Sequence, residues 1–263
     1  MNVKPLASII TVSFNSESTI KDTINSVLNQ TYANIEYILI DGGSTDNTLN
    51  IIKSYKEKFK NKEISYKWLS EPDNGIYDAM NKGVSIAKGE IIGILNSDDW
   101  YSNNAVEEVV KIFNTHTFTI VSGERRKVRF NKKPYGIHYN KKEIKAYIHK
   151  MMPINHAATF VHKTIYEKIG LFDTYYKLSA DYDFVYRAYN AGATFKFTDK
   201  IIVNMRSSGA TGQLNNLSIT AIEDHHIRKK NKVKFASYYY LKRKGFNLLI
   251  IIRDSLKKGL NKD

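Results

Sequence analysis

Hydrophobic residues in the first hundred positions alternate between short continuous runs and helical spacing. The short runs are rich in β-branched and aliphatic residues, as buried strands are, and they cover residues 8–14, 35–40, 64–69 and 90–95. Between the runs, apolar residues recur at every third or fourth position: Ile20, Ile24, Val27 and Leu28; Leu49, Ile52 and Tyr55; Ile76, Met80, Val84 and Ala87. This alternation predicts an α/β fold in which crossover helices cover a parallel sheet.

The pattern is less regular after residue 100. A helix is expected near residues 104–113, a mixed region follows over residues 155–205, and the chain is predicted to be helical from residue 214 to its end. A chain of 263 residues with 42% hydrophobic content suits one large α/β domain with an appendage better than two equal domains.

Polar segments follow all four predicted strands, at residues 15–17, 41–46, 70–75 and 96–99. In an open parallel sheet the ligand crevice lies beyond the carboxyl ends of the strands, so these segments are expected to line it. Turn geometry and helix capping explain any one such segment on structural grounds alone.

Two adjacent carboxylates, Asp98 and Asp99, are an exception, because neighbouring negative charges repel each other and do not improve a helix cap. They follow a strongly apolar run and are therefore expected to project into the crevice. Hard oxygen ligands suit Mn²⁺ or Mg²⁺ bound jointly by a protein and a diphosphate. Such an ion would neutralise a departing nucleoside diphosphate.

Positive charge is concentrated in two parts of the chain. Ten Lys and Arg residues against two acids lie in residues 124–150, and twelve against two lie in residues 225–263, whereas the rest of the chain is slightly acidic. Such segments attract phosphates, anionic lipid headgroups or nucleic acid, and their charge alone does not choose among these partners.

The absence of cysteine excludes a disulfide framework and a thiolate metal site, and it fits a reducing compartment. The first apolar run, of about eight residues after a single lysine and a proline, is typical of a buried strand and not of a signal sequence. We therefore expect a cytoplasmic protein.

Three ordered segments carry a family resemblance: SIITVSFNSESTIKDTINSVLNQTYANIEYILIDGGSTDNT, then SEPDNGIYDAMNKGVSIAKGEIIGILNSDDW, then HAATFVHKTIYEKIGLFDTYYKLSADYDFVYRA. Together they resemble the inverting GT-A glycosyltransferases of family 2, particularly enzymes that build bacterial O-antigen and capsular polysaccharides. The resemblance implies a Rossmann-like fold with a mixed central sheet that binds a nucleotide-sugar. It also implies a catalytic domain at 1–213, with a donor half at 1–100 and an acceptor half at 101–213, and a basic helical extension at 214–263.

The resemblance implies a UDP-sugar donor, carrying a hexose or N-acetylhexosamine, at the strand ends. Phe14 and Asn15 would begin the nucleotide pocket, and Asp41 would accept a hydrogen bond from uracil, although Phe14 could equally be a core residue. Positions beside the donor sugar, its phosphates and the metal are Asp73, Gly75, Asp78, Lys82, Asn96, Ser97 and Asp98. Asp78 and Lys82 are also spaced four apart, as in a surface ion pair on a helix.

In the family's metal motif the last carboxylate binds the ion, which implies Asp99 as the main ligand and Asp98 as a contact to ribose or metal. This chain has Asn96 where the family has a further acid. The resemblance also implies Asp181 as the base that takes the proton of the attacking acceptor hydroxyl. Two alternatives stay open: Asp181 could be a helix N-cap, and Asp183 could serve as the base.

Asp183 and His156 match positions on the acceptor side of the family's site. A loop at residues 206–212 is rich in small residues, and we expect it either to close over the donor, with Arg206 reaching a phosphate, or to be an ordinary surface loop.

The apolar run at residues 246–252 has seven residues, whereas a helix needs about 20 to cross a bilayer. Basic residues flank this run, which favours association with an anionic membrane surface, here the inner face of the bacterial cytoplasmic membrane. The resemblance implies an acceptor saccharide linked through diphosphate to a polyprenol. A homodimer interface is the alternative use of the apolar stripe.

Other functions fit the sequence less well. A dehydrogenase is excluded, because residues 15–18 provide no glycine-rich turn after the first strand. A sugar nucleotidyltransferase would share the architecture and the metal but would normally carry a glycine-rich phosphate loop. A basic nucleic-acid-binding protein is the non-enzymatic alternative, because the sequence pI is about 9.5, but no binding motif is present and we expect no nucleic-acid partner.

Overall fold

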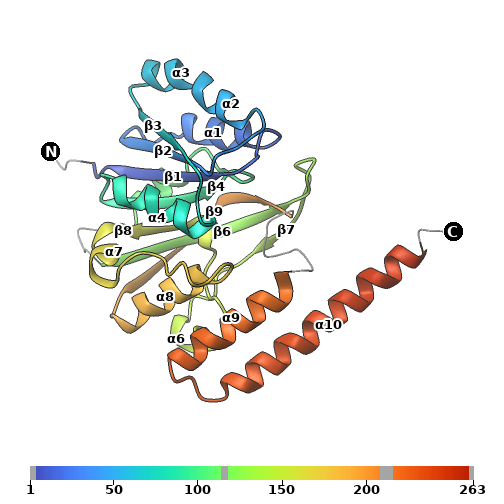
Figure 1. The fold of residues 1–263 in the computed structure, drawn as a ribbon. Helices are drawn as coiled ribbons and strands as arrows, with labels where there is room; N and C mark the ends of the chain where they lie inside the picture. The colour runs from blue at the N-terminus through green and yellow to red at the C-terminus, as the bar shows by residue number, and fades with distance from the viewer. Residues whose placement is uncertain (1–3, 114–117, 208–215, 261–263) are drawn as a thin grey trace.

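Four parallel strands form the N-terminal half of the sheet. The computed structural model describes residues 4–113, 118–207 and 216–260. The four strands lie in the order β3-β2-β1-β4 (Figure 1), and they are β1 (Ala7–Ser13), β2 (Ile35–Asp41), β3 (Ser65–Ser70) and β4 (Ile91–Asn96). Every pairing among them is parallel. The predicted strands and their parallel arrangement are therefore confirmed.

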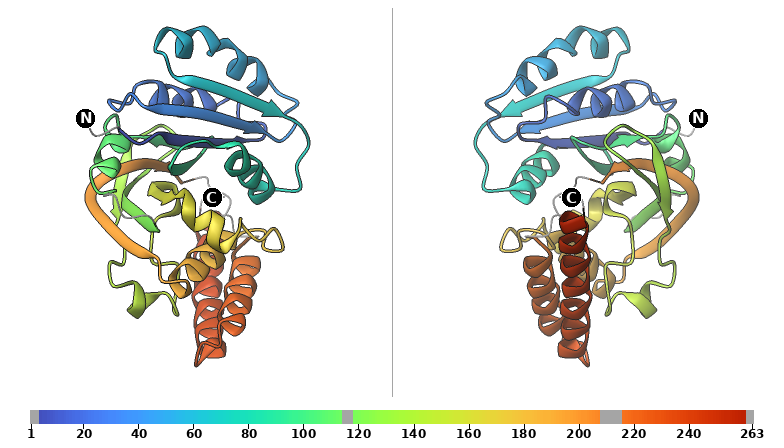
Figure 2. Two further views of the ribbon diagram at one scale, coloured as in Figure 1. Left: turned by 90° about the vertical axis from the view of Figure 1, so that its left-hand side faces the viewer. Right: turned by 90° about the vertical axis from the view of Figure 1, so that its right-hand side faces the viewer.

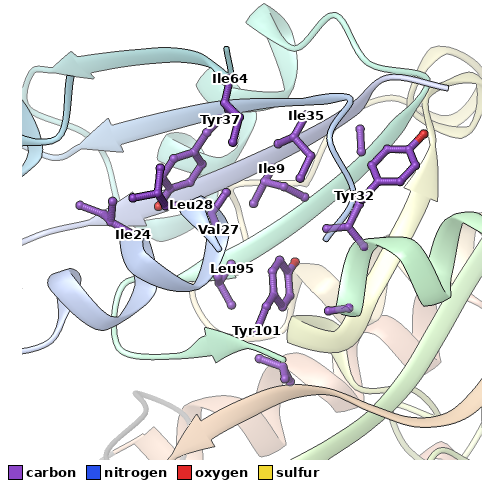
Figure 3. Close-up of a cluster of buried hydrophobic side chains, with 14 of the residues drawn as sticks. Ile9, Ile24, Val27, Leu28, Tyr32, Ile35, Tyr37, Ile64, Leu95 and Tyr101 are labelled. Carbon is purple, nitrogen blue, oxygen red and sulfur yellow. The ribbon is translucent and has the colours of Figure 1, made fainter. Parts of the chain in front are cut away.

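Helices cover both faces of this half. The helices α1 (Ile20–Leu28), α2 (Thr48–Ser54), α3 (Lys56–Asn61) and α5 (Ala105–Val110) belong with one hydrophobic cluster, and α4 (Ile76–Ile86) belongs with the other. Successive side chains of a strand point to opposite faces, so Ile9 of β1 packs in one cluster with Ile24 and Val27 of α1 (Figure 3), whereas Ile10 packs in the other with Met80 of α4.

Close approach of α4 to the sheet requires a glycine. A Cβ atom at Gly83 would lie 2.4 Å from Cγ2 of Ile10, a distance that packed carbon atoms do not tolerate. This contact fixes the height at which the N-terminus of α4 and its preceding loop lie over the strand ends.

The sheet continues with strands of mixed direction. Strand β8 (Thr159–His162) is antiparallel to β4, β6 (Thr119–Val128) is antiparallel to β8, and β9 (Thr194–Arg206) is parallel to β6. Two short strands, β5 (Trp100–Tyr101) and β7 (Pro134–His138), pair with β9 and β6. Short helices in this half are α6 (Ile144–Tyr147), the 3₁₀ helix η1 (His156–Ala158), α7 (Lys163–Ile169) and α8 (Ala180–Asn190). The prediction of a mixed central sheet is confirmed.

Two C-terminal helices, α9 (Asn216–Lys230) and α10 (Ala236–Leu260), run side by side below the sheet (Figures 1 and 2). The predicted boundary at 213/214 lies outside the described residues. Helix α9 packs on α8, and its Leu217, Ala221 and Ile227 are buried. This helix therefore belongs to the body of the protein. Within the described ranges, each helix is too short or too polar to cross a membrane.

Candidate active site

A cleft of about 900 Å³ opens at the carboxyl ends of the parallel strands. Its walls come from the strand-end loops, the start of α4, η1, the start of α8 and the helices α9 and α10. Nine of the residues expected in the site line it: Phe14, Asn15, Asp73, Gly75, Asn96, Ser97, Asp98, His156 and Asp181. The fold thus brings together residues that lie up to 167 positions apart in the sequence.

Phe14 projects into the cleft from the end of β1 and is 62% exposed, so its interpretation as a core residue is wrong. The next residue, Asn15, adopts a left-handed backbone conformation with φ of 48°. Its side-chain oxygen accepts a hydrogen bond from the backbone N–H of Thr45 at 2.9 Å, and its own N–H donates to Ser44 Oγ at 2.8 Å. These bonds join the first two strand-end loops.

Asp41 does not line the cleft, contrary to the expected contact with uracil. The residue is fully buried at the end of β2. Its carboxylate accepts hydrogen bonds from Ser13 Oγ (3.1 Å), Ser70 Oγ (2.7 Å) and both the N–H (3.0 Å) and Oγ (2.5 Å) of Ser44. Because these donors occupy both oxygens, Asp41 holds three strand ends together in this structure.

The loop before α4 divides between cleft and surface. Asp73 and Gly75 line the cleft, and Asp73 accepts the N–H of Gly75 at 2.9 Å. Asp78 and Lys82 do not line it. Lys82 instead pairs with Glu71 at 2.8 Å and with Asp78 at 3.7 Å, so the surface ion pair describes these two residues better than a donor contact does.

The two adjacent aspartates face different surroundings, contrary to the expected primary role of Asp99. Asp98 lines the cleft, whereas Asp99 is 1% exposed and lies beneath it. One oxygen of Asp99 accepts the backbone N–H of Arg206 at 3.0 Å, and the other has no hydrogen-bond partner among the described residues. Burial is the main cause that raises the pKa of both carboxyls, and for Asp99 the neighbouring Asp98 raises it further. The carboxylate that an ion in the cleft would meet is therefore Asp98.

Arg206 is a buried structural residue and does not reach into the cleft as expected. It is 3% exposed and pairs with Asp22 at 2.5 Å. Its guanidinium also donates to the backbone carbonyl of Asp98 and lies over the Trp100 ring, with its central carbon 4.7 Å from the ring centroid. Residues 208–212 of the proposed lid lie outside the described residues.

Asp181 lies in the first turn of α8 and faces the cleft. The N-cap of this helix is Ser179, so the N-cap interpretation of Asp181 is wrong. Its Oδ1 accepts hydrogen bonds from the Tyr77 hydroxyl at 3.2 Å and from the N–H of Tyr182 at 2.9 Å. No described residue donates to its Oδ2, which is therefore available to a bound molecule.

His156 and Asp183 differ in their relation to Asp181. His156 shares the cleft, and its Nε2 has no hydrogen-bond partner among the described residues. Burial lowers the pKa of His156, against an opposing effect of the Asp181 charge, so the ring is neutral near pH 7. Asp183 is completely buried and pairs with Arg187 at 2.7 Å and Lys230 at 3.3 Å. It lies outside the cleft lining, which excludes the expected acceptor-side role in this structure.

Basic side chains that the sequence did not single out also line the cleft. Arg125 comes from β6, where its Nη1 contacts Met205 Sδ at 2.9 Å and its Nε has no partner within the described ranges. His138 lies on the neighbouring strand, and burial together with the charge of Arg125 lowers the pKa of His138 to about 4. Arg243 of α10 and Lys177 before α8 are further cleft residues. The charge of residues 124–150 signalled a basic region but not which members turn inward.

The parallel half-sheet, its mixed continuation and a cleft with acidic side chains from both halves define a GT-A glycosyltransferase. The chain belongs to family 2 of these enzymes, because residues 8–175 match the family described as Glycosyl transferase family 2. This membership overrides the nucleotidyltransferase and nucleic-acid-binding alternatives.

Individual relatives agree with the family. An uncharacterized glycosyltransferase of Mycobacterium tuberculosis is 31% identical over 193 residues, covering 72% of this chain and 70% of that protein. Among solved structures, S. aureus TarS 1–349 in complex with UDP has a TM-score of 0.63 and 18% identity, over 85% of this chain and 69% of that one. The mannosyltransferase PcManGT from Pyrobaculum calidifontis, in complex with GDP-Man and Mn²⁺, has a TM-score of 0.67 and 16% identity, over 94% of this chain and 70% of that one. The structural similarities support the GT-A fold.

Proposed function

We propose that this protein transfers a hexose or N-acetylhexosamine from a UDP-sugar to an acceptor hydroxyl with inversion at the anomeric carbon. The observation that supports the proposal is that Asp98 and Asp181, from separate elements, face one cleft. One carboxylate is suited to the donor diphosphate and its ion, and the other to the acceptor proton. The UDP complex of TarS supports the choice of nucleotide, although PcManGT binds GDP-Man.

The residues at the strand end fit a divalent cation shared with a diphosphate. Asp98 supplies a carboxylate in the cleft, and Asn96, which also lines it, has a buried Oδ1 without a partner in the described part of the chain. No three His, Cys, Asp or Glu side chains within the described ranges are grouped so as to hold an ion alone. Mg²⁺ and Mn²⁺ often bind through one or two carboxylates plus substrate phosphates, so Asp98 would hold the ion together with the donor. When bound, the ion neutralises charge on the departing diphosphate.

Asp181 is suited to serve as the general base. Tyr77 and the N–H of Tyr182 hold its Oδ1, which leaves Oδ2 free to accept the proton of the acceptor hydroxyl. The hydroxyl oxygen then attacks the anomeric carbon as the bond to the diphosphate breaks. His156, neutral and unpartnered at Nε2, can bind a sugar hydroxyl beside this carboxylate.

The acceptor in this proposal is a saccharide linked through diphosphate to a polyprenol, and the enzyme acts at the inner face of the bacterial cytoplasmic membrane in surface polysaccharide synthesis. Exposed apolar residues on α10 support membrane association, namely Leu241, Phe246, Leu248 and Leu249. Lys242 and Lys244 lie among them, and such mixtures of basic and apolar residues bind anionic lipid surfaces. A homodimer that buries this face is the alternative.

The test of the transfer step compares Asp181→Asn with Asp199→Asn, an exposed carboxylate outside the cleft lining. UDP-hexoses and UDP-N-acetylhexosamines are screened for UDP release with Mn²⁺, with Mg²⁺ and with a chelator. We expect Asp181→Asn to bind UDP normally and to lose transfer by at least about 100-fold, because a general base contributes roughly 10²–10⁴. A near-normal rate in Asp181→Asn would remove it as the base, and full activity with the chelator would remove the metal.

A further inference from the structure

Helix α10 contributes a cation to the cleft. Arg243 lines the same cavity as Asp181, and its Nε is buried without a hydrogen-bond partner among the described residues. The nearby carboxylate of Asp224 already accepts the Ser179 hydroxyl at 3.0 Å and pairs with Arg228 at 3.5 Å. Arg243 is half-buried, and because the neighbouring Asp224 carboxylate is already engaged, its guanidinium can bind a further anion in the cleft.

Lys177 provides a second cation on the same wall. Its side chain is exposed and lines the cleft, and the described part of the chain gives it no ion pair. Its backbone is fixed, because its N–H donates to Glu223 Oε1 at 2.7 Å. Glu223 belongs to α9, so both cations depend on the C-terminal helix pair.

The cleft contains two basic groups with different neighbours. Burial lowers the pKa of Arg125 and the nearby charge of Asp99 opposes that shift, which places Arg125 at the Asp98 end of the cleft. Arg243 instead lies near Asp224: burial raises the pKa of Asp224, and the charges of Arg228 and Arg243 oppose that shift. Oδ1 of Asp224 accepts the hydroxyl of Ser179, the N-cap residue of the helix that carries Asp181. A donor diphosphate accounts for the first group. The second group, Arg243 with Lys177, lies on the side of the cleft that holds the proposed base, so a different anion would bind there.

From these contacts we infer that Arg243 and Lys177 form a subsite for a phosphate or diphosphate group carried by the acceptor. The inference rests on the proposed function, since it needs Asp98 at the donor end and Asp181 at the acceptor end. Arginine and lysine together provide directed donors and a mobile point charge, a combination suited to phosphate oxygens.

The opposite face of α10 indicates how such an acceptor would arrive. Leu241, Leu248 and Leu249 are 65%, 57% and 66% exposed and lie on the side of the helix away from Arg243 at helical spacing. The helix therefore presents a cation inward and apolar residues outward. A phosphate borne by a lipid would use both faces, whereas a soluble phosphorylated acceptor would use only the inner one.

The test uses full-length protein saturated with UDP and Mn²⁺, so that the donor end is filled. Calorimetry measures the binding of farnesyl diphosphate, inorganic pyrophosphate and farnesol to the wild type, Arg243→Gln and Lys177→Gln. Lys229→Gln is the matched control, because Lys229 is an exposed lysine of the neighbouring helix α9 that does not line the cleft. Thermal unfolding of each variant establishes that it is folded.

We expect Arg243→Gln to weaken farnesyl diphosphate binding about tenfold, which corresponds to about 1.4 kcal/mol, with a smaller loss for Lys177→Gln and no change for Lys229→Gln. If only farnesyl diphosphate binds in a way that depends on Arg243, the ligand is a phosphate carried by a lipid. If pyrophosphate binds equally well and also depends on Arg243, the ligand is a soluble phosphate. Both results support the subsite. Equal binding of farnesol, or unchanged affinity in a folded Arg243→Gln variant, overturns it. Failure of the wild type to bind UDP would instead refute the proposed function.

Discussion

Replacing Glu223 by alanine tests whether the C-terminal helices hold Asp181, the proposed base, in place. The Glu223 carboxylate accepts the backbone N–H groups of Lys177 at 2.7 Å and of Leu178 and Ser179 at 2.9 Å each. These three residues lead directly into α8, where Asp181 lies in the first turn. The carboxylate is therefore the anchor of the segment that aims the proposed base.

The magnitude follows from these contacts. Hydrogen bonds to a charged group contribute about 1.5–3 kcal/mol each, and water can replace part of this where the segment is exposed at Lys177. We expect Glu223→Ala to lower the free energy of unfolding by about 2–4 kcal/mol. A shift of the base by about 1 Å can cost roughly 100-fold in rate, so kcat should fall by that order while the KM for the donor changes little.

The assay measures kcat, the donor KM and UDP affinity at a temperature where the variant is folded. Glu223→Gln is the conservative comparison, because its amide oxygen can still accept some of these bonds, and it should recover part of kcat. A normal kcat in folded Glu223→Ala, with only the unfolding temperature lowered, would show that the anchor stabilises the fold without positioning Asp181.

Two further predictions separate neighbouring carboxylates. Asp98→Asn should reduce metal-dependent UDP release by roughly 10²–10³-fold. Asp99→Asn should keep more activity, because its remaining oxygen can still accept the Arg206 N–H. Equal losses in UDP-release assays would contradict the different positions of the two residues. Asp183→Ala should lower the free energy of unfolding, measured in urea, by about 3 kcal/mol, because it leaves Arg187 without its buried partner. The folded fraction should keep its kcat. A catalytic loss as large as that of Asp181→Asn would make Asp183 a candidate for the base again.

Periodicity predicted the parallel N-terminal half of the sheet well, because the local hydrophobic pattern there agrees with the position of each strand in the core. The strands β1, β2 and β4 are buried, largely apolar runs of six or seven residues, and the loops after β1, β3 and β4 line the cleft. The periodicity does not determine which way the side chains in those loops point. Asp98 and Asp99 are adjacent in sequence, yet only the first faces the cleft, because the second turns under the loop toward the backbone of Arg206.

The chain after residue 100 was harder to predict, because its cleft residues come from basic segments whose composition is typical of a solvent-exposed surface. Arg125 is one of several basic residues in β6, and the bulges beside it disturb the two-residue alternation that would have selected it. Arg243 lies on a lysine-rich helix, where only the packing of α10 against α9 determines which cation turns inward.

The sequence did not indicate that helix α9 packs against the body of the protein. Its packed face includes Glu223, Asp224 and Arg228, all buried, so charged residues of the kind that usually mark a solvated surface here mark the contact with the rest of the protein. Each has a defined partner: Glu223 binds three backbone N–H groups, Asp224 binds Ser179, and Arg228 binds the carbonyl of Lys150 at 2.9 Å. A chain shortened near residue 214 would therefore lack the Glu223 anchor of Asp181 as well as α10.

Membrane association can be tested without removing either helix, by Leu248→Ser and Leu249→Ser, which alter the outer face of α10 and leave α9 intact. These two changes should reduce sedimentation with anionic vesicles without reducing UDP binding, whereas unchanged sedimentation would count against a membrane role for that face.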